Sequence, residues 1–222
     1  MTDTLPYRMY LLAYDDSARG PFDRRRTGFL VRTAVLVELA SRGCLEETGD
    51  HVVRVTASGP PTGDPVLDEV MREAAGSSRG WKHLVRRHRS RTLKAVEDRL
   101  AARGLLTVDE RGGRRGRFAT RFSARGLTVS YPAAVKALTD HVSAVLHGTG
   151  PAADVTVADA ALVALCAAGG VPSVVTRRDI RVHRARVDAL TGRLGSLAPG
   201  LEKAVRGLRT TMVAAQGGMG GG

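Results

Sequence analysis

Residues 27–43 of the chain read TGFLVRTAVLVELASRG, and this stretch decides the fold. Gly43 stands where a glycine commonly ends a helix, and the apolar residues before it recur at helical spacing. The apolar positions are Leu30, Ala34, Leu36, Val37 and Ala40. Their face is broad, so the pattern predicts a helix over 27–42 at the centre of a helical protein.

The composition agrees with packed helices. Of the 222 residues, 43% are hydrophobic but only 4% are aromatic, so Leu, Val and Ala must supply the core. We therefore expect a mainly α, single compact domain over residues 1–215, with a central helical bundle, peripheral helices and one or two small β-hairpins. The Gly-rich ending QGGMGGG, residues 216–222, is expected to be a disordered tail.

Further helices are expected on both sides of the central one. Asp64 can cap the first of them, with Pro65 as its first residue, and Thr156 can cap another. The expected ranges are 65–75, 81–103 as one helix or two broken near Ser90, 132–147, 156–168, 179–195 and 201–215.

Short strands are expected between the helices. Residues 7–14 (YRMYLLAY) resemble a short strand or a buried lead-in. Residues 44–58 predict a small hairpin around Gly49-Asp50, and residues 105–109 and 117–122 predict two strands around a turn rich in Gly and Arg.

The charge and the targeting signals limit the partners and the compartment. A formal net charge of +12 favours an anionic partner, either nucleic acid or a lipid surface. Cys44 and Cys166 lie in apolar surroundings and are expected to be buried free thiols. Because the chain has no secretory signal and no apolar run of ~20 residues, we expect a cytoplasmic protein with at most peripheral membrane contact.

The sequence offers little support for catalysis. None of the six histidines forms a metal-binding pair with a glutamate between its members, and neither cysteine belongs to a C-x-x-C motif. The glycines at 112, 113 and 116 lack the Lys-Ser/Thr ending of a phosphate loop, and a Gly-x-Ser-x-Gly elbow is missing. We expect a protein that is not an enzyme and has no cofactor or metal.

Arginine is the exceptional residue. One cluster precedes the central helix, a second lies near the expected break at Ser90, and a third occupies the turn of the 105–122 hairpin. These clusters are Arg24, Arg25 and Arg26; Arg86, Arg87, Arg89, Arg91 and Lys94; and Arg111, Arg114, Arg115 and Arg117. Each cluster alone is explained by a solvated face. Together they suggest that a phosphomonoester headgroup binds at the N-terminus of the 27–42 helix, where free N–H groups favour phosphate.

The order of several motifs resembles a known family. LLAYDD, TGFLVRTAVLVELASRG, PTGDPVLDEV, the Trp81-Lys-His-Leu84 helix and LAARGLL together resemble the Golgi phosphoprotein family of phosphatidylinositol-4-phosphate-binding proteins, in its bacterial branch. The similarity runs from about residue 8 to 210. It implies a compact helical domain that binds membranes peripherally, and eukaryotic members act as adaptors that retain glycosyltransferases.

The resemblance also implies site residues. Arg32 falls on the family arginine that contacts the phosphate, whereas Asp23, with Phe22 beside it, replaces the headgroup-contacting tryptophan. The paired family arginines align near Ser90 and Leu93. The neighbouring Arg24, Arg25, Arg91 and Lys94 are expected to take their place. The family's apolar membrane-inserting hairpin is replaced by a loop that we expect to contact the membrane by charge, at about 1 kcal/mol for each basic residue. Its residues are Arg114, Arg115, Arg117 and Phe118.

Two other hypotheses remain open. Residues 91–103 followed by the hairpin 105–122 have the form of a winged-helix recognition helix and wing, although Glu97 and Asp98 make that helix acidic. Alternatively, the chain assists an enzyme without an active site of its own. Client membrane enzymes and a second copy of the chain are the expected protein partners, and nucleic acid is a less favoured one.

Overall fold

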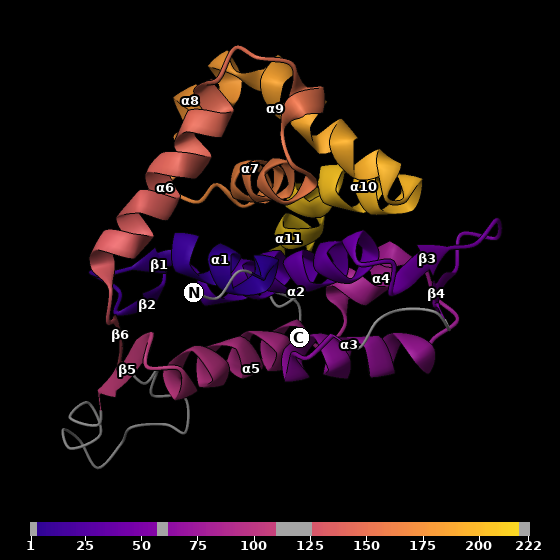
Figure 1. The fold of residues 1–222 in the computed structure, drawn as a ribbon, viewed down its shortest axis with the longest axis horizontal. Helices are drawn as coiled ribbons and strands as arrows, with labels where there is room; N and C mark the ends of the chain where they lie inside the picture. The colour runs from indigo at the N-terminus through magenta and orange to yellow at the C-terminus, as the bar shows by residue number, and fades with distance from the viewer. Residues whose placement is uncertain (1–3, 57–61, 110–125, 218–222) are drawn as a thin grey trace.

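The central helix lies where the sequence predicts it. In the computed structural model, which describes residues 4–56, 62–109 and 126–217, α2 (Arg24–Ser41) crosses the middle of the molecule (Figure 1). Every residue from Thr27 to Val37 is buried, as are Leu39 and Ala40. The prediction of a mainly α fold around this helix is confirmed.

Helices on several sides cover α2. Its neighbours are α1 (Leu5–Leu12), α3 (Pro65–Ala75), α4 (Trp81–Arg86), α5 (Arg89–Ala102), α7 (Val157–Gly169) and α11 (Leu208–Gly217). In Figure 1, α3 and α5 lie below α2, and α7 lies above it. One hydrophobic cluster extends from Leu5 to Met212, so distant parts of the chain share a core.

A second group of helices arches over α7. It comprises α6 (Pro132–His147), α8 (Arg177–Val182), α9 (Arg184–Gly192) and α10 (Pro199–Arg206), with the short 3₁₀ helices η2 (Ala152–Asp154) and η3 (Arg193–Ser196). Figure 1 shows α6 rising on one side and α10 descending on the other. Packing of α9, α10 and η3 against α7 joins the arch to the core.

Three antiparallel strand pairs occur in the described residues, where one or two hairpins were expected. They are β1 (Tyr14–Asp15) with β2 (Gly20–Pro21), β3 (Leu45–Glu47) with β4 (Val53–Val55), and β5 (Leu106–Asp109) with β6 (Gly126–Val129). The β3–β4 pair confirms the hairpin expected within 44–58. Leu106 pairs with Val129, so the partner of the expected strand at 105–109 is not 117–122, which lies outside the described residues.

Capping residues explain where several helices begin. The Asp64 carboxylate accepts hydrogen bonds from the backbone N–H groups of Val66 and Leu67, so α3 begins as predicted. Thr156 caps α7 through the N–H of Asp159 at 3.1 Å. A reciprocal capping box between Thr176 and Asp179 starts α8 at Arg177, two residues before the expected position.

Other boundaries differ from the prediction. Residues 5–12 form a helix, not a strand, and the burial of both its faces removes the periodicity that identifies a helix. The break expected near Ser90 lies at Arg87 and His88, where His88 has a φ of 51°. The expected 179–195 helix is divided at His183, and the 201–215 helix is preceded by Pro199 and divided at Gly207.

The C-terminal residues and the two cysteines were also predicted from the sequence. α11 continues to Gly217, so the first two residues of the expected tail are helical, and 218–222 lie outside the described residues. Cys44 and Cys166 are buried and form no disulfide, as predicted. In the described ranges, none of the helices combines the length and the apolar character needed to cross a membrane.

Candidate functional site

The N-terminus of α2 already holds a carboxylate. α2 begins at Arg24, three residues earlier than expected, and Asp23 accepts hydrogen bonds from the N–H groups of Arg25 (3.0 Å) and Arg26 (2.9 Å). Phe22 beside it is half-buried and packs against the core. The free N–H groups expected to bind a phosphate are therefore partly used by the chain's own side chain.

Arg24 points to α5. Its guanidinium donates two hydrogen bonds to Glu97, at 2.8 Å and 2.5 Å, and Tyr10 donates a third at 3.2 Å. Burial, together with the neighbouring Glu97 carboxylate, raises the pKa of the Tyr10 hydroxyl. A bidentate arginine–carboxylate pair of this kind fixes both side chains, so Arg24 joins α2 to α5.

Arg32, the residue expected to contact the phosphate, is sealed from solvent. The side chain is fully buried, donates to the carbonyl oxygen of Leu84 at 3.0 Å and to Thr92 Oγ1 at 3.1 Å, and forms an ion pair with Glu73 at 2.8 Å. Burial lowers the pKa of Arg32, Glu73 opposes that shift, and the nearby positive charge of Arg87 adds to it. Arg32 therefore lies beneath α4 and connects α2 with α3, α4 and α5.

The other expected headgroup residues are also engaged with groups of the chain itself. Arg91 forms an ion pair with Glu69 at 2.6 Å, and Lys94 pairs with Asp98 at 2.5 Å. Arg25 donates to the carbonyl oxygen of Ala215 at 3.3 Å. Headgroup binding by these residues stays a prediction, as does the expected membrane loop. The loop residues Arg114, Arg115, Arg117 and Phe118 lie outside the described residues.

A cationic surface does form around α4, and the sequence revealed only part of it. Trp81, Leu84 and Val85 are buried, and Trp81 Nε1 donates to Glu47 at 3.3 Å, so the other face of this helix is directed outward. We use the name α4 surface for five exposed residues. They are Arg79, Lys82, His83, Arg86 and Arg87.

The α4 surface is densely positive. Burial and the nearby charges of Arg79, Arg87 and Arg86 lower the pKa of His83, so these three positive charges act on the same imidazole. Within the described part of the chain, no carboxylate forms an ion pair with the side chain of Arg79, Lys82 or Arg86. Arg79 and Lys82 were missed because they precede the expected arginine run in sequence, and only the burial of Trp81, Leu84 and Val85 shows which face of α4 is exposed.

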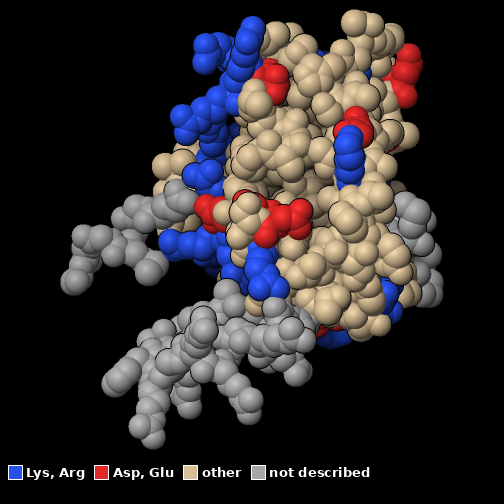
Figure 2. Space-filling model, turned by 90° about the vertical axis from the view of Figure 1, so that its left-hand side faces the viewer, with Lys and Arg blue, Asp and Glu red and all other residues tan. Residues whose placement is uncertain are grey.

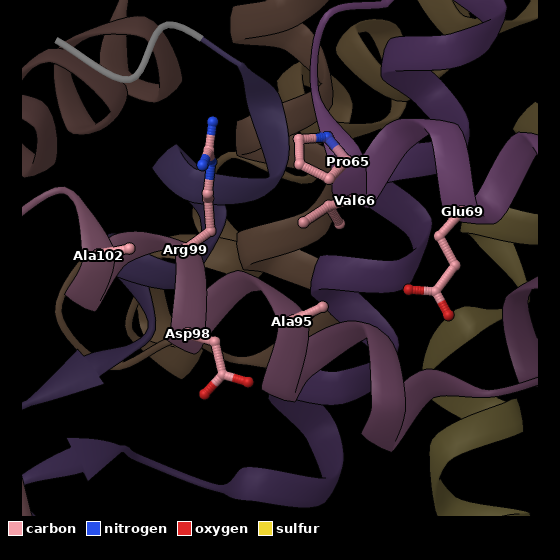
Figure 3. A pocket seen from close by; sticks show the side chains of 7 residues that line it. All are labelled: Pro65, Val66, Glu69, Ala95, Asp98, Arg99 and Ala102. Atoms are coloured by element: carbon pink, nitrogen blue, oxygen red, sulfur yellow. The ribbon is translucent and has the colours of Figure 1, made fainter.

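A groove between α3 and α5 is less suited to an anion. It has a volume of about 330 Å³, and its lining includes the carboxylates of Glu69 and Asp98 but only one cation, Arg99, whose side chain points away from both of them (Figure 3). Two carboxylates against one guanidinium give this groove no positive excess. Elsewhere in the described ranges, His, Cys, Asp and Glu side chains form no group of three or more that could hold a metal ion.

The winged-helix hypothesis gains no support from α5. Glu97 of this helix is buried against Arg24 and Tyr10, while the exposed Arg91 and Lys94 are paired with carboxylates. A recognition helix needs free donors on its exposed face. The arrangement of α5 is that of a helix that packs against α2.

Comparison with known proteins gives a family. The sequence pattern of the family described as Golgi phosphoprotein 3 (GPP34) matches residues 5–208, from α1 to the first residue of α11. Comparison with the curated proteins finds no match to the chain. Since the family pattern covers nearly the whole sequence, the chain belongs to the Golgi phosphoprotein 3 (GPP34) family.

Proposed function

We propose that this protein binds anionic membrane surfaces peripherally and that the α4 surface contacts phosphorylated lipid headgroups. The observation that carries the proposal is that Arg79, Lys82, Arg86 and Arg87 are all exposed on α4 or directly beside it, and that the three arginines are close enough to His83 for their charges to act on it. Such a face attracts an anionic bilayer, and guanidinium groups suit phosphate because they donate paired hydrogen bonds. Membership of the family supports the same role.

Arg32 has a supporting part in this proposal. It lies beneath the α4 surface, since it binds the carbonyl oxygen of Leu84 and is close enough to Arg87 for the two charges to interact. It is sealed from solvent, so it acts as a positioning residue that holds α4 on α2.

The proposed function includes a preferred lipid headgroup and protein partners. A phosphomonoester such as phosphatidylinositol-4-phosphate is the proposed headgroup, because its extra negative charge would gain most from several guanidinium groups. We propose a binding protein, not an enzyme, which could serve as an adaptor for membrane enzymes or assemble with a second copy of itself. Each basic residue near an anionic surface contributes about 1 kcal/mol, so three together correspond to about 100-fold in affinity.

Vesicle co-sedimentation tests the proposal. The purified chain is mixed with vesicles of phosphatidylcholine alone, with added phosphatidylserine, or with added phosphatidylinositol-4-phosphate at matched surface charge. We expect binding only to the two anionic compositions, and tighter binding to the phosphomonoester. The triple variant Arg79→Gln, Lys82→Gln, Arg86→Gln should bind about 100-fold more weakly.

A matched control removes the same charge elsewhere. Lys136→Gln, Arg178→Gln, Lys203→Gln changes exposed residues of α6, α8 and α10 and leaves the α4 surface intact. This variant should lose little affinity. Equal loss in the two variants would show that net charge alone drives binding, and equal binding to neutral and anionic vesicles would overturn the proposed function.

A further inference from the structure

A second positive region lies away from the α4 surface. A groove of about 1090 Å³ is bounded by α7, α8, α9, α10, α11 and the first turn of α2. We call it the arginine groove after the six side chains that line it. These are Arg26, Arg177, Arg181, Arg184, Arg206 and Arg209.

The charges of the arginine groove are only partly balanced. Asp188 is the one acidic side chain among the described lining residues, and it already pairs with Arg206 at 3.4 Å and Arg184 at 3.8 Å. Arg177, Arg181 and Arg209 are exposed, and no ion pair joins them to a carboxylate within the described ranges. The groove therefore has a positive excess that suits an anionic group.

Apolar side chains form the rest of the lining. Ala164 and Ala167 of α7 are buried beside Val205 and Met212 of α10 and α11. α7 can lie this close to the start of α2 because it ends in a glycine: a Cβ atom on Gly169 would come within 2.6 Å of Leu30 Cδ1. Small residues on α7 thus leave a continuous apolar strip between the helices.

At the mouth of the arginine groove, exposed aliphatic side chains lie beside exposed arginines. Val213, which is 58% exposed, lines the groove, and Val182, which is 64% exposed, lies on α8 beside Arg181. In Figure 2, which looks at the α6 side of the molecule, Lys and Arg side chains form a column along one edge. Exposed aliphatic residues beside cations match the boundary between a lipid headgroup and its chain.

We infer that the arginine groove binds a single molecule of an anionic lipid. Its phosphate would lie among Arg177, Arg181 and Arg209, and an acyl chain would lie on the strip that contains Ala164 and Met212. The volume of about 1090 Å³ is slightly above the range of ~300–1,000 Å³ that is usual for ligand pockets. The ligand is an amphiphile because neither the arginines nor the apolar strip alone accounts for the lining.

This site is independent of the proposed function. The α4 surface would bind a bilayer by charge, whereas the arginine groove would extract or hold one lipid molecule. Their residues do not overlap, so each can be removed while the other remains. Failure at one site therefore leaves the other intact in the same experiments.

Equilibrium binding of soluble amphiphiles tests the inference. Isothermal titration with dodecyl phosphate below its micellar concentration should give saturable binding of one molecule per chain. Inorganic phosphate lacks the chain and its burial on the apolar strip, and dodecyl maltoside lacks the charged hydrogen bonds to the arginines. Each should bind at least about 10-fold more weakly.

Two variants locate the binding. Arg177→Gln, Arg181→Gln, Arg209→Gln changes exposed side chains only and should weaken dodecyl phosphate binding by at least about 10-fold. Ala164→Leu fills the apolar strip and should also weaken it; because this residue is buried, its circular dichroism and melting curve are compared with those of the wild type. The triple Gln variant of the α4 surface should bind dodecyl phosphate normally.

Three results would overturn the inference. Unchanged dodecyl phosphate binding in the arginine-groove triple variant would place the amphiphile elsewhere. Equal binding of inorganic phosphate would reduce the site to a simple anion site. Binding of an acidic amphipathic peptide in place of dodecyl phosphate, lost in the same triple variant, would identify the groove as a protein interface.

Discussion

For a single residue such as Arg32, the sequence predicts the position on a helix but not the direction of the side chain. Its position on the central helix was predicted, but its direction was not, because α2 is buried on all sides and periodicity assigns it no outward face. Its carboxylate partner, Glu73, lies 41 residues further along the chain on α3. A pairing of that kind is set by packing and leaves no local signal.

Arg32→Met should destabilise the fold strongly. The substitution leaves the largely buried Glu73 carboxylate without its cation. It also removes the hydrogen bonds to the Leu84 carbonyl oxygen and to Thr92. Loss of one partner of a buried pair costs about 3–5 kcal/mol. Urea unfolding followed by circular dichroism should show a fall of this size in the free energy of unfolding.

The double variant Arg32→Met, Glu73→Gln is the control for the Arg32→Met experiment. Removing both charges should restore part of the lost free energy, because no unpaired carboxylate then remains. If Arg32→Met unfolds at the same urea concentration as the wild type, Arg32 is not the buried connection between α2, α3, α4 and α5 that the structure shows.

At the scale of elements, Glu47 joins parts of the chain that are far apart in sequence. Its carboxylate on β3 accepts hydrogen bonds from the backbone N–H of Gly200 in α10 at 2.7 Å and from Trp81 Nε1 in α4 at 3.3 Å, and lies 3.0 Å from His51 Nδ1. Burial opposes ionisation of Glu47, but the bonds from Gly200, His51 and Trp81 outweigh it and lower its pKa.

The stability that Glu47 provides should depend on pH. Because its pKa in the folded state lies below the ordinary value of 4.5, the contribution is complete above that pH and is lost as pH falls through the folded-state value. Glu47→Gln should therefore be less stable than the wild type at pH 7. The difference in unfolding free energy should shrink below pH 4.5, and a difference that grows with acidification would contradict the assignment.

Gly200→Ala tests the same connection from its other side. A Cβ atom at this position would lie 2.5 Å from Glu47 Oε1, too close for contact, so the carboxylate would have to move away from the N–H of α10. We expect a lower melting temperature. In the Glu47→Ala background, which removes the carboxylate, Gly200→Ala should cost much less; an equal cost in both backgrounds would show that the contact with Glu47 is not its cause.

Capping residues in the sequence predicted where some helices begin. Asp64 and Thr156 predicted the starts of α3 and α7 because a cap is a contact between near neighbours in sequence. The pairing of β5 with residues 126–129 was missed because residues 110–125 lie between the two strands, and register follows from the turn only in short hairpins. The α1 helix was ambiguous because it is buried on more than one face.

At the scale of the whole molecule, the sequence predicted the mainly α fold and the family, and the comparison confirms the family. The charge of +12 predicted an anionic partner but not the surface that would meet it. That surface depends on how α4 lies over α2 and how α8 to α11 surround a groove. Both arrangements are tertiary, so arginine clusters read along the chain could not define them.

Vesicle binding should fall steeply with salt if the α4 surface meets the bilayer through its charges. The Debye length shortens from ~30 Å at 0.01 M to ~10 Å at 0.1 M and ~3 Å at 1 M, so exposed cations lose their attraction first. Co-sedimentation with phosphatidylserine vesicles should weaken at least about 10-fold between roughly 0.05 M and 0.5 M salt.

The α4 surface and the arginine groove should differ in how much binding remains at high salt. Dodecyl phosphate held in the arginine groove also loses charge attraction, but burial of its chain does not depend on screening, so its affinity should fall less steeply than that of vesicles. The Arg79→Gln, Lys82→Gln, Arg86→Gln variant should show a flatter salt dependence of vesicle binding than the wild type. If its slope equals that of the wild type, the α4 surface does not supply the charges that attract the membrane.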